Sequence, residues 1–528
     1  MSWITNQKNG RTWMQKILRT FVSISIIMVL FGFAVPQDPK VDWDMVAKIR
    51  EEGFQRSQVM DIAGYMSDVL GARLTLSQDM KRAQTWVRHK MEKIGLVNIV
   101  IEPFMDYGVT WDNEYFSLHM LEPDYQPLVG FPLTHTPSTP GKITCQTIIA
   151  EVKTKQDLDE FRGKLEGAVV LTTPPAEIDL DALARGTPRR TPEELKRMEG
   201  DVIPKPRRRR KDDSPPNPDI LKAEERMNFY KAEGVKALLE CRSGKLGAVR
   251  GFARPGTKQD KWSRQESLNS LPIIAVTPEH YNRMYRILKK GIPVTIELEV
   301  RNRLGEEIEK ACNVLGEIPG TDLKDETVMI GAHFDTWHAS PNSSDNTSGC
   351  AVALEAARIL NAIGARPRRT IRVALWAGEE QGLHGSREYV TKHFGNPEDP
   401  EIGIKPEYEK FSVYFNQDYG AGAFRGIFLQ GNEYARRPFE AWMEPLMDLG
   451  FRTISIQSVG STDHVSFNDV GLPGFQFIQD RIPGTAGHTN LDFFDTLQSE
   501  DLMKNAVIMA VFAYHAAMSD DQMPRKTK

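Results

Sequence analysis

Histidine and acidic side chains collect where successive apolar segments of this sequence end. Such segments are "TVMIGA", "IRVALWAG", "SVYFNQ" and "GFQFIQ", and each reads as a buried strand. Ligand sites of parallel sheets lie at the carboxyl ends of their strands. Taken singly, each residue has an ordinary structural role, but together they place only His and carboxylates on one edge. In chain order they are His333, Asp335, Asp345, Glu379, Glu380, Asp418, His488 and Asp492.

Two histidines and several carboxylates, without a thiolate, are a ligand set typical of hydrolytic zinc sites with open positions for water. One ion needs about three protein ligands, so five candidates favour two ions that share a bridging carboxylate. Glu379 and Glu380 are adjacent and leave a strand in different directions. One can therefore bind metal while the other accepts a proton from the attacking water.

The segments that must position these residues predict an α/β fold. From Val294 onward, near-continuous apolar strands alternate with helical patterns, which indicates a largely parallel sheet covered on both faces. The helix expected at 347–364 carries an apolar stripe and reaches Gly364. Upstream, residues 61–104 read as two helices and the strand "LVNIVIEPF".

The middle of the chain has a different texture. From about Leu121 to Pro293, short strand patterns such as "TIIAEV" and "LPIIAV" are separated by turns and helices. Residues 189–219 are rich in charge and proline, so we expect an exposed or partly disordered loop there. The four arginines at 207–210 raise the alternative of nucleic-acid binding. The acidic pair that follows them favours a solvated loop instead.

Composition excludes some classes of function and suggests export. The chain has 528 residues and a net charge of −4, so no global field attracts nucleic acid or anionic membranes. Basic residues precede an apolar run from Phe21 to Val35, which is short for a membrane span of roughly 20 residues. We expect a signal peptide cleaved near Ala34, and thus a periplasmic or secreted protein; an uncleaved N-terminal anchor is the alternative. The four cysteines show no zinc-finger spacing and are expected to be free thiols.

Several motifs together resemble a known family. They are "GAHFDTW", "SSDNTSGCAVALEAARIL", "WAGEEQGLHGS", "NQDYGAG", "STDHVSFNDVGLPGF" and "GHTNLDFFDTL". In type and order they resemble the co-catalytic di-zinc exopeptidases, a family that includes aminopeptidase Y, the plasma glutamate carboxypeptidase type and, more distantly, glutaminyl cyclase. The resemblance covers 294–528 and the N-terminal helices. The middle segment resembles the protease-associated (PA) domain that some members carry as an insert.

The resemblance implies a role for each ligand-type residue. Asp345 would bridge two Zn²⁺ ions, and Glu379 would be the base that activates the water between them and later protonates the leaving amine. Asp335 would orient the imidazole of His333, and Asp492 could do the same near His488. The family also implies a cis peptide bond between Asp345 and Asn346. The other implied ligands are His333 and Asp418 for one ion, and Glu380 and His488 for the second.

The resemblance also implies an architecture. We expect a three-layer α/β/α zinc-exopeptidase fold with a mixed, largely parallel central sheet, plus a smaller inserted α+β domain of the PA type. The expected divisions are a signal peptide at 1–36, the first part of the peptidase domain at 37–120, the insert at 121–293 with its charged loop at 189–219, and the catalytic domain at 294–528.

Some positions depart from the family or have no clear role. Asn346 stands where many members carry a second Asp, and His338 has no family role, so we expect it to be a loop residue. Asp463 and His464 occupy a pocket-lining position and are expected to contact substrate or to support the ligands. Arg425 and Arg481 follow strands near the site and could bind a substrate carboxylate, although surface positions are commoner for arginine.

The expected function is hydrolysis of terminal peptide bonds, with peptides as the substrates and no nucleic-acid partner. The sequence does not choose between aminopeptidase and carboxypeptidase activity, and it does not indicate an oligomeric state. Three alternatives stay open. They are a single-zinc acyltransferase of the glutaminyl cyclase type, a non-catalytic binding module of the same fold, and a hydrolase of non-peptide amides.

Overall fold

The computed structural model describes residues 39–178, 180, 189–202, 217, 219–254, 262–482 and 486–526. Residues 41–528 form one compact unit. The expected signal peptide at 1–36 lies outside the described residues. In the part of the chain that is described, no helix is both long enough and apolar enough to cross a membrane.

A large mixed sheet is the centre of the fold. Its strand order is β1-β10-β12-β11-β15-β18-β16-β17. The four inner strands β12, β11, β15 and β18 run parallel, whereas β1, β10 and β16 pair antiparallel with their inner neighbours. The expected mixed, largely parallel sheet is therefore confirmed. The strands are β1 (Val97–Gly108), β10 (Glu309–Ile318), β12 (Arg369–Trp376), β11 (Leu323–His333), β15 (Phe411–Asn416), β18 (Gly474–Gln479), β16 (Phe424–Phe428) and β17 (Thr453–Ser455).

Helices cover both faces of this sheet because its inner strands are apolar on both sides. Val328 and Ile330 of β11 point into one buried cluster, and Met329 between them points into another. The first cluster includes residues of α2 (Trp43–Gln55), α3 (Val59–Gly64), α4 (Gln78–Lys93), α11 (Ser348–Ala362), α13 (Arg436–Met443) and α15 (Ser499–Met518). The second includes residues of α12 (His384–His393) and α14 (His464–Asn468).

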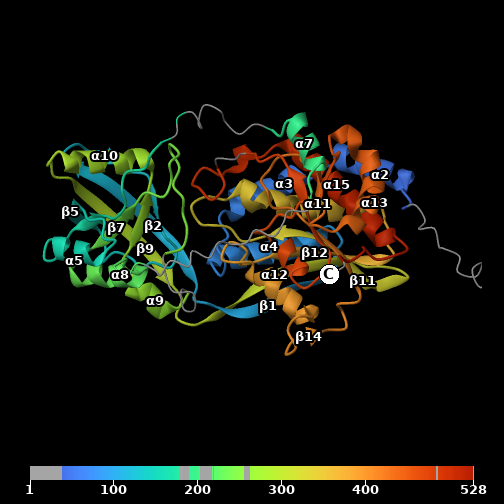
Figure 1. The fold of residues 1–528 in the computed structure, drawn as a ribbon, viewed down its shortest axis with the longest axis horizontal. Helices are drawn as coiled ribbons and strands as arrows, with labels where there is room; N and C mark the ends of the chain where they lie inside the picture. The colour runs from blue at the N-terminus through green and yellow to red at the C-terminus, as the bar shows by residue number, and fades with distance from the viewer. Residues whose placement is uncertain are drawn as a thin grey trace, which may run out of the picture. The chain divides into compact units, whose positions relative to one another are not determined.

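Helix α11 follows the loop that contains Asp345 and is buried on nearly all sides. Every residue from Ser348 to Leu360 is buried, including the charged Glu355 and Arg358. It packs against β11 and β12 and against the helices α2, α3 and α15 (Figure 1). The chain leaves it through Gly364 at φ 68°, where a left-handed residue ends the helix. The helix expected at 347–364 is thus confirmed.

A second mixed sheet is built from the middle of the chain, in the order β3-β2-β9-β5-β6-β7-β8-β4. Apolar clusters lie on both of its faces, and α5, α8, α9 and α10 accompany it (Figure 1). Its classification as a PA domain, and the domain limits, stay predictions. The elements are β2 (Trp111–Glu122), β3 (Gln126–Pro127), β4 (Gly130–Pro132), β5 (Ile143–Ile149), α5 (Lys155–Phe161), β6 (Val169–Leu171), α8 (Ala223–Ala232), β7 (Ala237–Glu240), α9 (Arg264–Asn269), β8 (Ile273–Val276), α10 (Pro278–Lys289) and β9 (Thr295–Leu304).

The charged stretch is only in part what the sequence suggested. The arginines at 207–210 lie outside the described residues. Residues 189–202, in contrast, do not form an exposed loop: they contain α7 (Pro192–Glu199), which packs against β17. Arg189 pairs with the buried carboxylates of Asp480 and Asp501, at 3.2 and 2.6 Å. These ion pairs hold the stretch against the main sheet, which composition alone does not reveal.

A buried ion network joins α2 to α11. The guanidinium of Arg358 donates to both carboxylate oxygens of Glu355, at 2.7 and 2.9 Å, and to Glu52 at 2.6 Å. Oε1 of Glu355 also accepts a hydrogen bond from the backbone N–H of Gln58 at 3.0 Å. All three charged residues are buried. Removing the cation would therefore leave the carboxylate of Glu355 without a cation in the core, while Glu52 would keep its ion pair with Arg56.

We predict that Arg358→Met lowers the free energy of unfolding by about 3–5 kcal/mol, because it leaves the buried carboxylate of Glu355 without a cation. The matched control is Arg368→Met, which breaks ion pairs with the exposed Asp322 and Asp520 and should cost no more than about 1 kcal/mol. Thermal unfolding of both variants measures the difference. Equal shifts of Tm would contradict the assignment of Arg358 as a core interaction.

Candidate metal centre

The main sheet brings the sequence-predicted ligands to one edge. β11 ends at His333, β12 leads into Glu379 and Glu380, β15 leads into Asp418, and the loop after β18 carries His488. Since these four strands are parallel neighbours, their carboxyl ends meet at the same edge. Asp345 comes from the loop between β11 and α11.

The carboxylate of Asp345 lies between two histidines and faces each with a different oxygen. Its Oδ1 is 3.2 Å from Nε2 of His333, which is also 3.1 Å from Oδ1 of Asp418. Its Oδ2 is 2.9 Å from Nε2 of His488, which is also 3.0 Å from Oε2 of Glu380. The structure thus has two ligand clusters with one carboxylate between them.

The donor atoms of two triplets are close enough to hold metal ions. Those of His333, Glu379 and Asp418 lie within 4.8 Å of one another, and so do those of Asp345, Glu380 and His488. Glu379 therefore belongs to the first triplet and Glu380 to the second. The adjacent glutamates separate as expected, one toward each group.

Burial and charge shift the ionisation of the whole cluster. Burial opposes protonation of His488, but Glu380 and Asp345 outweigh it and raise its pKa to about 11. Burial likewise opposes protonation of His333, and Asp418 and Glu379 raise its pKa well above the ordinary value. Burial raises the pKa of Glu380 to about 7, and the two histidines together hold the pKa of Asp345 far below its usual range. Such crowding of like charge favours the presence of a cation.

The cluster fits zinc by its chemistry. Imidazole nitrogens and carboxylate oxygens are ligands that Zn²⁺ accepts, and each group offers about three of them. Oε1 of Glu380 is buried and accepts no hydrogen bond among the described residues. A buried carboxylate oxygen without a partner is costly, and a metal ion is one way to satisfy it.

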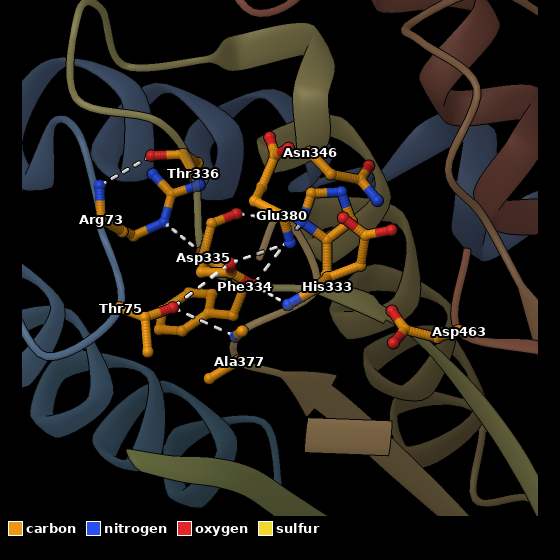
Figure 2. A network of polar contacts seen from close by, with 12 residues as sticks. Arg73, Thr75, His333, Phe334, Asp335, Thr336, Asn346, Ala377, Glu380 and Asp463 are labelled. Carbon is orange, nitrogen blue, oxygen red and sulfur yellow. Dashed lines mark hydrogen bonds and ion pairs between the residues drawn. The ribbon is translucent and has the colours of Figure 1, made fainter. Parts of the chain in front are cut away.

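Asp335 contacts the site differently from the expectation. Its backbone carbonyl, not its carboxylate, accepts from Nδ1 of His333 at 2.9 Å, since Oδ1 is 3.8 Å away. The carboxylate instead accepts the backbone N–H groups of Glu379 and Glu380, at 3.1 and 3.3 Å (Figure 2). The expectation that this carboxylate orients the imidazole stays a prediction. It holds the turn that carries both glutamates.

Two residues that the sequence did not single out complete this support. The hydroxyl of Thr75 accepts the N–H of Gly378 at 3.1 Å, and it lies 3.3 Å from the carboxylate of Asp335. The fully buried Arg73 donates to the carbonyl of Phe334 at 2.8 Å (Figure 2). It also donates to Oγ1 of Thr347 at 2.8 Å. Both lie in "GARLTL", where neither periodicity nor a motif marks them.

Asp492 also supports a different partner from the one expected. Its carboxylate accepts the N–H and the hydroxyl of Ser344, at 2.9 and 2.8 Å. It therefore fixes the loop just before Asp345, and its expected role toward His488 stays a prediction. The peptide bond between Asp345 and Asn346 is cis, which confirms the expectation from the resemblance. A Cβ at Gly349 would lie 2.4 Å from Oδ1 of Asn346, so only glycine fits where α11 meets this loop.

The remaining candidates lie near the cluster or away from it. Asp463 is fully buried at the start of α14, and burial with nearby carboxylates raises its pKa to about 7. Nε2 of His464 lies 3.1 Å from the carbonyl of Val459, so this nitrogen binds its own loop. Their roles toward substrate stay predictions. His338 contacts the carbonyl of Pro132 and the ring of Trp111 and belongs to neither metal triplet, in agreement with a loop residue.

The middle of the chain reaches this site. The ring of Phe252 lies edge-on against the imidazole of His488, with centroids 5.6 Å apart. The N–H of Val249 donates to Oδ1 of Asn490 at 2.6 Å, and the side chain of Asn490 donates to the carbonyl of Gly247. The loop that carries one candidate ligand is thus packed against residues that follow β7.

Comparison with known proteins now identifies the domain. Residues 313–513, which contain every member of the two triplets, match the sequence model of peptidase family M28. This part of the chain is therefore similar to the peptidases of that family. Carboxypeptidase Q of Mus musculus is 22% identical over 473 residues, which are 88% of this chain and 86% of that protein.

Solved structures share the fold over nearly the whole chain. A peptidase M28 precursor from Shewanella amazonensis has a TM-score of 0.64 at 23% identity, and the match covers 92% of this chain and 99% of that one. A zinc aminopeptidase from Bacillus subtilis has a TM-score of 0.54 at 18% identity, and the match covers 89% and 95%. The fold of an M28 peptidase therefore extends beyond the 201 residues that match the family by sequence.

We predict that Asp335→Asn lowers zinc affinity or kcat/KM ten- to a hundredfold, because the turn with Glu379 and Glu380 loses a charged acceptor behind the ligands. The matched control is Asp325→Asn, which changes an exposed residue of β11, the strand that precedes Asp335. Metal titration and steady-state kinetics measure both effects. If the two variants behave alike, the carboxylate of Asp335 does not position this turn.

Proposed function

We propose that this chain is an exported, zinc-dependent exopeptidase that hydrolyses terminal peptide bonds and holds two Zn²⁺ ions. One observation carries the proposal: Asp345 directs its two carboxylate oxygens at two separate groups of ligands. A shared carboxylate is the feature that distinguishes a two-metal hydrolytic centre from a single site. The similarity of residues 313–513 to a peptidase family supports peptides as the substrates.

The proposed ligands follow from the contacts. His333 and Asp418 would hold one ion, Glu380 and His488 the other, and Asp345 would bind both. When bound, zinc supplies Lewis acidity that polarises the scissile carbonyl and makes water a stronger nucleophile at neutral pH. The protein contributes a fixed set of donors at one strand edge, so little reorganisation is needed during turnover.

Glu379 is the proposed general base. Its carboxylate lies within 4.8 Å of donor atoms of His333 and Asp418. Because Asp345 would be the third ligand of the ion held by these two residues, Glu379 is not needed as a ligand. Burial, together with the carboxylates of Asp418, Glu380 and Asp463, raises its pKa well above the ordinary value. A carboxylate with raised affinity for protons can accept one from water and return it to the leaving nitrogen.

The relatives support a zinc exopeptidase but not one direction of cleavage. The mouse relative is named a carboxypeptidase, and the Bacillus structure is described as a zinc aminopeptidase. The two ligand groups favour this function over a single-zinc acyltransferase. The presence of all five ligands and of Glu379 speaks against a non-catalytic binding module. The basic and apolar N-terminal segment supports export, with the mature chain beginning after about Ala34.

We predict that Glu379→Gln lowers kcat on a short peptide by at least a hundredfold, because proton transfer by a positioned base contributes about 10²–10⁴-fold. Zinc content should stay at two ions per chain, since the amide replaces no proposed ligand. The control is Glu401→Gln, which changes an exposed glutamate. Activity should be measured together with metal content. A Glu379→Gln enzyme with full activity would rule out this base.

The metal assignment makes a second prediction. His488→Ala should lower zinc content from two ions to one per chain, because it removes a ligand of only one group. Asp345→Ala should lower zinc content further, since both groups lose a ligand. Metal analysis of purified variants measures this, and chelation followed by zinc should abolish and restore wild-type activity. A wild-type enzyme with one zinc per chain would favour the acyltransferase alternative.

A further inference from the structure

A pocket of about 440 Å³ opens beside the proposed metal ligands. This volume is within the range of small-molecule sites, which is about 300–1,000 Å³. Asp345 and Asp418 line one part of it. The remaining charged side chains of the lining are all cationic: Arg242, Lys245, Arg250 and Arg481. The pocket therefore has an acidic metal-binding part and a basic part.

The basic part combines residues from distant segments. Arg481 lies two residues after the end of β18 in the main sheet. Arg250 lies in the segment after β7 of the second sheet. Arg250 forms a β-bridge with Thr489, the residue after the proposed ligand His488. The hydrogen bonds of Val249 and Asn490 hold the two segments together. The position of Arg250 relative to the metal centre is thus fixed by backbone contacts.

Two of the four cations have their charge available for a ligand. Among the described residues, neither Arg250 nor Arg481 forms an ion pair. The guanidinium of Arg250 lies over the ring of Phe252 at 5.1 Å, and that of Arg481 lies over Tyr419 at 5.3 Å. Stacking on a ring fixes the plane of a guanidinium and leaves its N–H groups free to bind at the edge. Arg242, in contrast, donates to Glu240 at 2.6 Å.

We propose that this pocket binds a carboxylate of the peptide substrate through Arg250 and Arg481, and in the first place the free C-terminal carboxylate. The inference rests on the proposed function, because the scissile bond must lie at the metal ligands. Guanidinium groups bind carboxylates with two parallel hydrogen bonds, which gives both affinity and orientation. A protonated amine would be repelled from this part of the pocket. A short peptide whose C-terminal carboxylate is bound here would therefore release its C-terminal residue on cleavage.

Three substrates test which carboxylate is used. Ala-Ala has a free C-terminal carboxylate, Ala-Ala amide has none, and Ala-Glu amide offers a side-chain carboxylate only. All three keep a free amine, so an enzyme that requires only the amine cleaves them all. We expect wild-type kcat/KM to be about 10–100-fold higher for Ala-Ala than for Ala-Ala amide, the range for hydrogen bonds to charged groups. Cleavage of Ala-Glu amide as fast as Ala-Ala would assign the pocket to a side-chain carboxylate.

Substitutions test whether the two arginines are responsible. Arg481→Gln and Arg250→Gln should each lower kcat/KM for Ala-Ala at least about tenfold and change it little for Ala-Ala amide, mainly through KM. The matched control is Arg286→Gln, which alters an exposed arginine of α10 that does not line the pocket. Its kcat/KM should equal that of the wild type for both substrates. Zinc content should be unchanged in all three variants.

The outcomes separate this inference from the proposed function. If wild-type enzyme cleaves the acid and both amides equally well, the carboxylate subsite is wrong and the exopeptidase assignment stands. If the arginine variants lower the rates for acid and amide alike, the arginines support the fold and do not select the substrate, which also overturns the inference. If zinc-loaded enzyme cleaves neither these substrates nor longer peptides, the proposed function itself fails.

Discussion

The carboxylate of Asp345 between two histidines is the constraint on which the site depends. Each oxygen contacts a different imidazole, and each imidazole contacts one further carboxylate. Buried like charges repel one another strongly in a medium of low polarity, so this arrangement is stable only with positive charge between its members. Metal ions would supply that charge in the proposed enzyme.

The scaffold keeps the cluster in place from behind. The carboxylate of Asp335 accepts the N–H groups of Glu379 and Glu380. The carboxylate of Asp492 accepts the N–H of Ser344, the residue before Asp345. Arg73 links the end of β11 to Thr347. Each support binds backbone and positions a ligand indirectly, which allows the ligand side chains to turn toward one another. Backbone anchoring of this kind gives a site more precision than a loop alone provides.

The fold and the ligand set were largely predictable from the sequence, and the supporting contacts were not. Apolar runs mark the inner strands because both of their faces are buried, and ligand types at the ends of those strands mark the edge. Periodicity missed the long strands β2 and β9, whose burial patterns are irregular. The role of Asp335 depends on which atom faces the imidazole, and spacing cannot specify that. The contact of Phe252 with His488 joins residues 236 positions apart, which no local pattern encodes.

The most direct test of the central claim is anomalous diffraction at the zinc absorption edge from crystals of the zinc-loaded enzyme. The account predicts two peaks roughly 3.5–4 Å apart, with one oxygen of Asp345 facing each. The peak nearer His333 should also contact Asp418, and the other should contact Glu380 and His488. A single peak, or two peaks of which Asp345 contacts only one, would contradict the bridging role on which the proposed function rests.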